Sequence, residues 1–441
     1  MRRAGALAVL ACIVGLSGRA AEPAPEAAQL KSTYVRLANN ANAVLWESPT
    51  PGPRGRIVAI NTHPGHNNNF EYFIGQELVQ RGYRAVLLNY YGRETTMEEF
   101  FPAIAAAVRY ARGLSGVEKV VFATHSGGGP ELTFYQEIAE KGPAACQQPD
   151  RIYPCKAAGL DGLPKVDGIL LLDINIGAPH RIVSIDPAVE NAAPRKRAAS
   201  LDLWAPRNGY DAKTHTATYS DAFVKRFLAG QHARTERLVA DAQARLRAID
   251  AGQGLFNDDE PFFVAGMAEN SVGARINLAD ARLLSRTHAP HLHLKADGST
   301  PVEIVHSTRS PQGMSADRDT FEETGQEVTV RHFLSFQALH TTADYALTED
   351  SMRGIDWRSS GNSAPGNVEN ITVPTLVMAA TCAIHLVPLE TVFDHSAAKD
   401  KEFVAIEGAN HSFMPCRPEF GDTRKRAFDY VDAWLSRPGR L

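Results

Sequence analysis

Residues 120–129 of this 441-residue chain read Val-Val-Phe-Ala-Thr-His-Ser-Gly-Gly-Gly, and this stretch decides the fold. The apolar run 120–123 predicts a strand buried on both faces. Small residues, Thr124 and Gly128, stand two positions before and after Ser126, and residues 130–141 have the pattern of a helix. A strand that turns so tightly into a helix lifts the Ser126 hydroxyl above the sheet edge, beside the positive end of the helix dipole.

Strand-like and helix-like runs alternate on both sides of this segment, which predicts a mainly parallel sheet with helices on both faces. The fold class is therefore α/β. The expected strands are 56–61, 84–89, 117–123, 166–173, 375–380 and 402–406, and the expected helices are 73–82, 97–114, 130–141, a helix from about 388, and 423–435.

The alternation stops in the middle of the chain, where we expect an inserted, mostly helical cap domain at 181–365. Its main elements are a long charged helix from 221 to about 251 and a hairpin of 291–295 with 301–306 around Asp297-Gly298. The sheet domain would then comprise 50–180 and 366–441, preceded by a leader and first edge strands at 21–49. Aromatic residues of the cap could line a substrate pocket or pack its own core: Trp204, Tyr210, Phe256, Phe262, Phe263, Phe333, Phe336 and Trp357.

The N-terminus has the pattern of a secretory signal peptide, residues 1–20, with two arginines, an apolar run at 4–16 and small residues before the expected cleavage site. The alternative is a lipoprotein signal ending at Cys12. No other run reaches the roughly 20 apolar residues of a membrane span. We therefore expect an exported protein, periplasmic or extracellular.

Export bears on the cysteines. Cleavage removes Cys12 and leaves four, an even number that predicts two disulfides with three possible connectivities. We favour Cys146–Cys155 and Cys382–Cys416, because the first pair closes a short polar loop.

The composition is that of a globular protein, with 44% hydrophobic and 22% charged residues. The 46 Lys plus Arg against 50 Asp plus Glu give a net charge of −4. This near-neutral balance gives no electrostatic reason to expect a nucleic acid or an anionic membrane as partner.

The turn at Ser126 resembles the nucleophile elbow, G-x-S-x-G, of the α/β-hydrolase family, with Thr124 at the first glycine position. A glycine-rich turn could instead bind a phosphate or dinucleotide, but no Lys follows and the G-x-G-x-x-G spacing is absent. The resemblance extends over 50–180 and 366–441. It implies that His411, in the loop after the last strand, is the general base for Ser126.

The same resemblance implies an oxyanion hole. One donor would be the backbone N–H of Gly127, after the nucleophile, and another would come from the turn Asn61–Thr62–His63–Pro64–Gly65–His66. Because Pro64 has no N–H, Gly65 or His66 must donate there. His63 and His66 could alternatively bind a metal, but no third His or carboxylate is nearby in the sequence.

The third member of a Ser-His-acid triad is not at its usual place in the sequence. The family keeps an Asp in the loop after the strand 375–380, and here residues 381–388 contain neither Asp nor Glu. We favour Asp173, at the end of the strand 166–173, with Glu390 as the alternative, and a third possibility is that no carboxylate takes part.

The implied chemistry is transfer of an acyl group to water without a cofactor or metal. A carboxylic-ester hydrolase acting on a small, partly apolar or aromatic molecule is the leading hypothesis. An amide, lactone or peptide bond could be cleaved by the same residues, and a non-catalytic binding protein is the alternative that the missing Asp favours. The sequence leaves the oligomeric state open.

Overall fold

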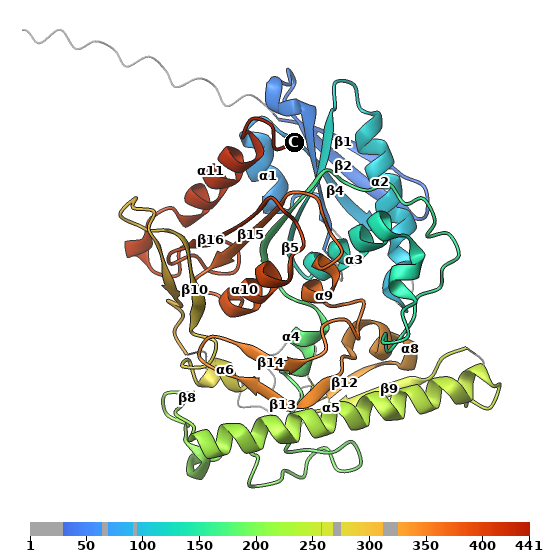
Figure 1. Cartoon of the computed structure of the whole chain (residues 1–441), viewed down its shortest axis with the longest axis vertical. Coiled ribbons are helices and arrows are strands. Elements are labelled where there is room, and N and C mark those ends of the chain that lie inside the picture. The colour runs from blue at the N-terminus through green and yellow to red at the C-terminus, as the bar shows by residue number, and fades with distance from the viewer. Residues whose placement is uncertain (1–29, 64–68, 91–94, 257, 268–274, 312–324) are drawn as a thin grey trace, which may run out of the picture.

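The computed structural model describes residues 30–63, 69–90, 95–256, 258–267, 275–311 and 325–441, and a ten-stranded sheet runs through it (Figure 1). The predicted signal peptide lies outside these residues. In spatial order the strands are β1 (Lys31–Arg36), β2 (Ala41–Glu47), β4 (Arg84–Tyr90), β3 (Ile57–Asn61), β5 (Lys119–Ser126), β6 (Gly168–Ile174), β15 (Thr375–Ala380), β16 (Lys401–Ile406), β10 (Arg286–Leu294) and β11 (Val302–His306).

The interior of this sheet is parallel. All neighbours from β4 to β10 run parallel, while β1, β2 and β11 add antiparallel pairs at the two ends. The predicted α/β class is thereby confirmed. In β5, Val120 and Phe122 join one hydrophobic cluster and Val121 and Ala123 join another, so the strand is buried on both faces.

Helices cover both faces of the sheet (Figure 1). One layer contains α1 (Phe73–Gln80) and α11 (Thr423–Leu435), whose apolar residues share a cluster with Val121. The other layer contains α2 (Phe101–Gly113), α3 (Gly128–Lys141), α9 (Ala364–Val368) and α10 (Leu386–His395). Short turns of 3₁₀ helix lie at η1 (Pro53–Arg56), η2 (Met97–Phe100), η3 (Pro143–Cys146), η4 (Pro206–Asn208) and η6 (Pro418–Phe420).

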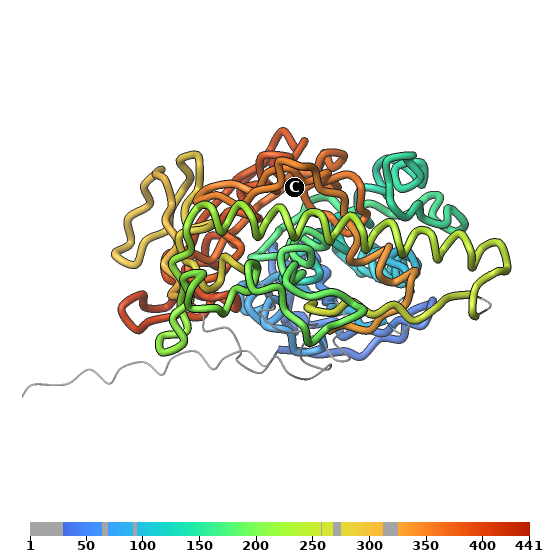
Figure 2. The backbone as a smooth tube through the Cα atoms, turned by 90° about the horizontal axis from the view of Figure 1, so that it is seen from below, coloured from blue at the N-terminus to red at the C-terminus, as the bar shows by residue number. Residues whose placement is uncertain are grey.

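The expected insertion is built around α5 (Asp221–Asp250), which crosses the molecule below the sheet (Figures 1 and 2). Strands accompany this helix, in three two-stranded sheets within the described residues. The remaining elements are α4 (Ala178–Ile182), β7 (Tyr210–Asp211), β8 (Thr216–Ala217), β9 (Pro261–Ala265), α6 (Ile276–Ala279), β12 (Gly325–Thr329), α8 (Val330–His332), the π-helical turn η5 (Phe333–Gln337), β13 (Thr341–Leu347) and β14 (Met352–Ile355).

The predicted hairpin forms, but it does not belong to a separate cap. Its first strand, β10, pairs in parallel with β16, so that β10 and β11 extend the central sheet, although both strands of the hairpin lie inside the range 181–365. The cap boundaries therefore need correction here. The strand pattern was visible in the sequence, whereas its pairing with a strand more than 100 positions away was not.

Two disulfides join Cys146 to Cys155 and Cys382 to Cys416, which are the pairs favoured from the sequence. Among the described helices, none has both the length and the apolar character needed to cross a membrane.

Candidate active site

The chain turns sharply at Ser126, the last residue of β5. Its φ is +52°, a left-handed conformation that is costly for a residue with a side chain. The turn leaves no space beside it, since a Cβ at Gly128 would come within 2.3 Å of the Thr62 carbonyl oxygen. At Gly129 a Cβ would come within 2.5 Å of the Ile174 Cβ. The glycines therefore let α3 begin directly against the neighbouring strands, and this geometry is that of the predicted elbow.

Ser126 opens into a cavity of 390 Å³ at the carboxyl ends of the strands. His411 lines the same cavity, so the structure brings together two residues that are 285 positions apart in the sequence. The other lining residues come from the segments that follow β6, β15 and β16, and His180 among them lies on α4: Asn175, His180, Cys382, Ala383, Ile384, His385, Asn410 and Ser412. Seven of the ten described residues that line the cavity have polar side chains.

Asp173 is fully buried beside this cavity, near the end of β6. Its Oδ2 lies 2.7 Å from His411 Nδ1, and its Oδ1 accepts a hydrogen bond of 3.0 Å from the Ala380 backbone N–H. Burial alone would raise the pKa of this carboxyl, but the hydrogen bonds and charges of His385 and His411 hold it well below its usual range. Asp173 is thus an ionised acceptor that fixes the proton of His411 on Nδ1.

His385 is a second histidine on the same carboxylate, and it is not among the site residues expected from the sequence. Its Nδ1 lies 3.1 Å from Asp173 Oδ2, the oxygen that also accepts from His411. Burial lowers the pKa of His385, with Asp173 opposing that shift, so the imidazole is neutral and donates from Nδ1. His385 occupies the loop where the family carries its acid, and this loop supplies a donor to the acid instead. The signal in the sequence was a histidine in the loop where the acid was expected, combined with the absence of a carboxylate from that loop.

His125, the residue before Ser126, is hydrogen-bonded to the loop of His411. Its Nε2 lies 2.6 Å from the His411 carbonyl oxygen, which can only accept, so Nε2 carries the proton. Its Nδ1 lies 2.6 Å from the Tyr72 hydroxyl, which therefore donates. The two imidazole rings are 4.3 Å apart between centroids. Tyr72 and His125 are thus positioning residues for His411 that no local sequence pattern indicates.

We expect His125 to make the protein less stable in acid. Burial, reinforced by the charge of His411, lowers the pKa of His125 to about 3. Below pH 6.5 the imidazole of His125 is protonated in the unfolded chain but not in the folded protein. The free energy of unfolding therefore decreases as the pH is lowered, until the pKa of the folded state is reached. The expected loss is about 1.4 kcal/mol per pH unit. Glutamine in His125→Gln cannot titrate. When the free energy of unfolding is measured with urea at several pH values between 6.5 and 4, its decrease per pH unit should be smaller in the variant by that amount. An equal decrease in both proteins would contradict the assignment.

Glu390, the alternative acid, does not contact His411. It is buried in α10 and accepts hydrogen bonds from the backbone N–H groups of His288 and Ala289, at 2.9 and 3.0 Å. A third partner is His291 Nε2 at 2.8 Å. All three lie on β10, so Glu390 fastens that strand to α10.

The expected oxyanion residues are only partly described. Gly127 stands immediately after Ser126 and directly precedes α3, as the resemblance requires. Gly65 and His66 lie outside the described residues.

The disulfide Cys382–Cys416 joins the loop of His385 to the loop of His411. Cys382 lines the cavity, and its backbone N–H donates to the Ala409 carbonyl at 2.8 Å. Cys416 follows His411 by five residues, and its N–H donates to the Gly408 carbonyl at 2.9 Å. The bridge therefore constrains both histidines that share Asp173.

We expect the double variant Cys382→Ser/Cys416→Ser to lose catalytic rate while it still folds. A shift of about 1 Å in a reacting group can cost up to roughly 100-fold, so a fall in kcat of about tenfold is expected for a loosened His411 loop. The matched control is Cys146→Ser/Cys155→Ser, which removes a bridge that lies away from the cavity. Equal kcat values for both variants, at a temperature where circular dichroism shows both folded, would contradict this role.

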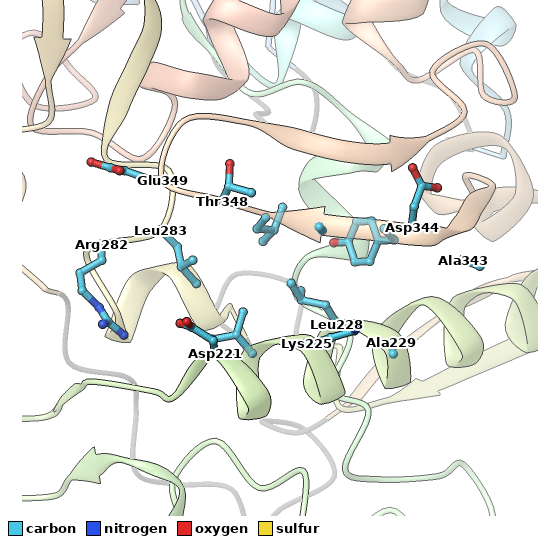
Figure 3. Close-up of a pocket in the computed structure, with 14 residues that line it drawn as sticks. Asp221, Lys225, Leu228, Ala229, Arg282, Leu283, Ala343, Asp344, Thr348 and Glu349 are labelled. Atoms are coloured by element: carbon cyan, nitrogen blue, oxygen red, sulfur yellow. The ribbon is translucent and has the colours of Figure 1, made fainter.

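A second cavity, of 510 Å³, lies in the insertion between α5 and β13 (Figure 3). Its floor is apolar, with Leu228, Tyr345 and Leu347, and charged residues such as Asp221 and Arg282 surround it. It shares no lining residue with the cavity of Ser126.

Of the two interpretations of the cap aromatics, packing in the core is the one that the described residues favour. Trp204, Tyr210, Phe262 and Phe333 are buried in the core, and Phe256 is exposed. None of the eight lines the cavity of Ser126 as far as the described residues form it. These aromatic residues therefore do not contribute to the described lining of that cavity.

Asp173, His385 and His411 could together ligate a metal ion, since one donor atom from each lies within 4.8 Å of the others. A divalent ion between these atoms would have to replace the two Nδ1 protons that now bind Asp173. The hydrogen-bonded arrangement accounts for all three side chains without one.

Comparison with known proteins gives similar folds only. No protein-family model and no curated protein matches the chain. Similar solved structures include the hypothetical protein PA2218 from Pseudomonas aeruginosa, with 13% identity and a TM-score of 0.43 over 95% of this chain and 96% of that chain. Another is the alpha/beta hydrolase GrgF from Penicillium sp. sh18, with 11% identity and a TM-score of 0.41 over 92% and 98%. A third is Est1E from Butyrivibrio proteoclasticus, with 12% identity and a TM-score of 0.39 over 92% and 97%. At these values the likeness carries no statement about activity.

Proposed function

We infer that this chain, whose fold is that of the α/β hydrolases, is an exported serine hydrolase that cleaves a carboxylic ester. The observation that carries the proposal is the single cavity lined by both Ser126, at a strained elbow, and His411, whose Nδ1 lies 2.7 Å from the buried Asp173 carboxylate. A nucleophile, a base and a group that orients the base are the parts that acyl transfer requires.

In the proposed mechanism, Ser126 Oγ attacks the carbonyl carbon of the ester while His411 Nε2 takes the hydroxyl proton. Because Asp173 holds a proton on His411 Nδ1, Nε2 is free to act as the base. The same proton then passes to the leaving alcohol, and the acyl group stays on Ser126. Water repeats the sequence on the acyl-enzyme and restores the serine.

The tetrahedral intermediate carries a negative charge on the former carbonyl oxygen. The backbone N–H of Gly127 would bind this oxyanion, assisted by the N–H of Gly65 or His66. Each such donor is typically worth about 3 kcal/mol at the transition state.

Export is part of the proposal. The two disulfides suit an oxidising compartment, and the signal-like segment 1–20 supplies a route to it. An amide or lactone bond is the alternative target of the same residues, and the two carboxylate-bound histidines favour a catalytic over a purely binding role.

The test is covalent labelling of the purified mature protein by a fluorophosphonate, which reacts with activated serines. We expect one label per chain, located on Ser126 by peptide mass spectrometry. Absence of labelling in well-folded protein that also hydrolyses no p-nitrophenyl ester would reject the proposal.

A further inference from the structure

One buried arginine near the cavity has no partner among the residues that the structure describes. Within the described residues four arginines are buried: Arg151, Arg234, Arg275 and Arg309. Arg151 binds Glu137 at 3.0 Å, and Arg234 binds the Asp186 carbonyl at 2.8 Å. Arg309 donates to three backbone carbonyls. Arg275 is 8% exposed, its Nε is buried without a partner, and no hydrogen bond or ion pair joins its guanidinium to another described residue.

Such a charge is expensive to bury, because it has lost its water without gaining an anion. Burial, followed by the charge of Arg181, lowers the pKa of Arg275 to about 9, so the guanidinium remains charged at neutral pH. Among the described residues no acidic group contributes to that shift. The described part of the protein therefore gives this cation no counter-ion.

Arg275 is not itself among the residues that line the cavity of Ser126, but hydrogen bonds connect its segment to that lining. It directly precedes α6, whose Asn277 carbonyl accepts from Arg309 Nη1 at 2.6 Å. The neighbouring Thr308 donates its N–H to the Thr381 carbonyl at 2.8 Å, and Thr381 precedes the cavity residue Cys382.

Electrostatics agree with this position. The charge of Arg275 contributes to lowering the pKa of His180 and of His385, after the larger effect of burial. Both histidines line the cavity and are therefore neutral. The positive charge near these two histidines therefore comes from Arg275 and from Arg181, which follows His180 on α4.

We propose that Arg275 binds a carboxylate of the substrate, so that the enzyme cleaves esters whose acyl part carries a second, free carboxylate. This deepens the proposed function and rests on it. The planar guanidinium offers a carboxylate two parallel hydrogen bonds, and seven of the ten described residues that line the cavity have polar side chains.

The kinetic test uses matched substrates, the p-nitrophenyl monoesters of succinic, glutaric and adipic acid and their methyl diesters, which have nearly the same shape without the charge. We expect wild-type kcat/KM to favour at least one free acid over its methyl ester by about 100-fold. Arg275→Met should abolish that preference by slowing the acid alone. Arg282→Met, which removes a largely exposed arginine of the insertion, should leave it unchanged.

Binding is measured separately by the melting temperature in glutarate, in phosphate and in neutral glutaramide. Glutarate should raise the melting temperature of the wild type and not that of Arg275→Met, whereas stabilisation by phosphate alone would overturn the choice of a carboxylate. Arg275→Met removes a buried charge and strands no partner, so it should fold, and Arg275→Gln is the second variant.

The outcomes separate the two proposals. Equal rates for acid and methyl ester in the wild type would overturn the role of Arg275 and leave the serine hydrolase intact. No hydrolysis and no fluorophosphonate labelling would reject the hydrolase, while stabilisation by glutarate would still report on the anion site.

Discussion

Replacing Ser126 with alanine is expected to lower kcat for a p-nitrophenyl ester by about 10⁵- to 10⁶-fold and to abolish fluorophosphonate labelling. The loss is this large because Ser126 would supply the attacking oxygen, and the other residues of a triad act only through it. The residual rate would come from the oxyanion hole and from substrate binding. Burst kinetics in the wild type, absent from Ser126→Ala, would show the acyl-enzyme directly.

The fold should survive this substitution. Alanine and serine meet similar steric limits at the φ of +52° that Ser126 adopts. The tight turn depends on the small size of the glycines and not on the Ser126 hydroxyl. The matched control is Ser412→Ala, which removes a hydroxyl from the same cavity beside His411. A comparable loss in Ser412→Ala, or labelling that persists in Ser126→Ala, would place the nucleophile elsewhere.

The sheet and the turn at Ser126 could be predicted from the sequence because both produce local residue patterns. Buried strands and amphipathic helices repeat with recognisable periods, and the long helix expected from 221 to about 251 is α5, which ends at Asp250. The tight turn at Ser126 shows as small residues around it. That Asp173 would lie near Ser126 could be predicted for a related reason, since the carboxyl ends of neighbouring parallel strands meet at one edge of the sheet.

Contacts between distant segments were not accessible in this way. The hydrogen bonds of His125 to Tyr72 and to the His411 carbonyl join three segments that are far apart in the sequence, and no local pattern in any of them indicates the partner. The pairing of β10 with β16 depends likewise on where the insertion returns to the sheet. Arg275 belongs to this group, because an unpaired buried charge appears only when the surroundings are known.

Replacing Asp173 with asparagine is expected to lower kcat by about 10⁴-fold with little change in KM. An amide that turns its NH₂ toward His411 Nδ1 needs an unprotonated nitrogen there, which moves the imidazole proton to Nε2 and removes the base. Here His385 donates to the same oxygen, so the amide would have to satisfy two imidazoles at once. Single-turnover kinetics would show slow acylation rather than weak binding.

The matched control is Glu390→Gln, the other carboxylate considered from the sequence. Glu390 is as buried as Asp173 but accepts its hydrogen bonds from β10, so its amide should leave kcat unchanged and lower the free energy of unfolding by about 2 kcal/mol. The pH dependence separates the two cases further. Because the pKa of Asp173 is held below its usual range, that carboxylate stays ionised well below pH 5, so its own protonation should cause no loss of wild-type rate between pH 8 and 5. A large loss of kcat in Glu390→Gln with full activity in Asp173→Asn would exchange the two roles.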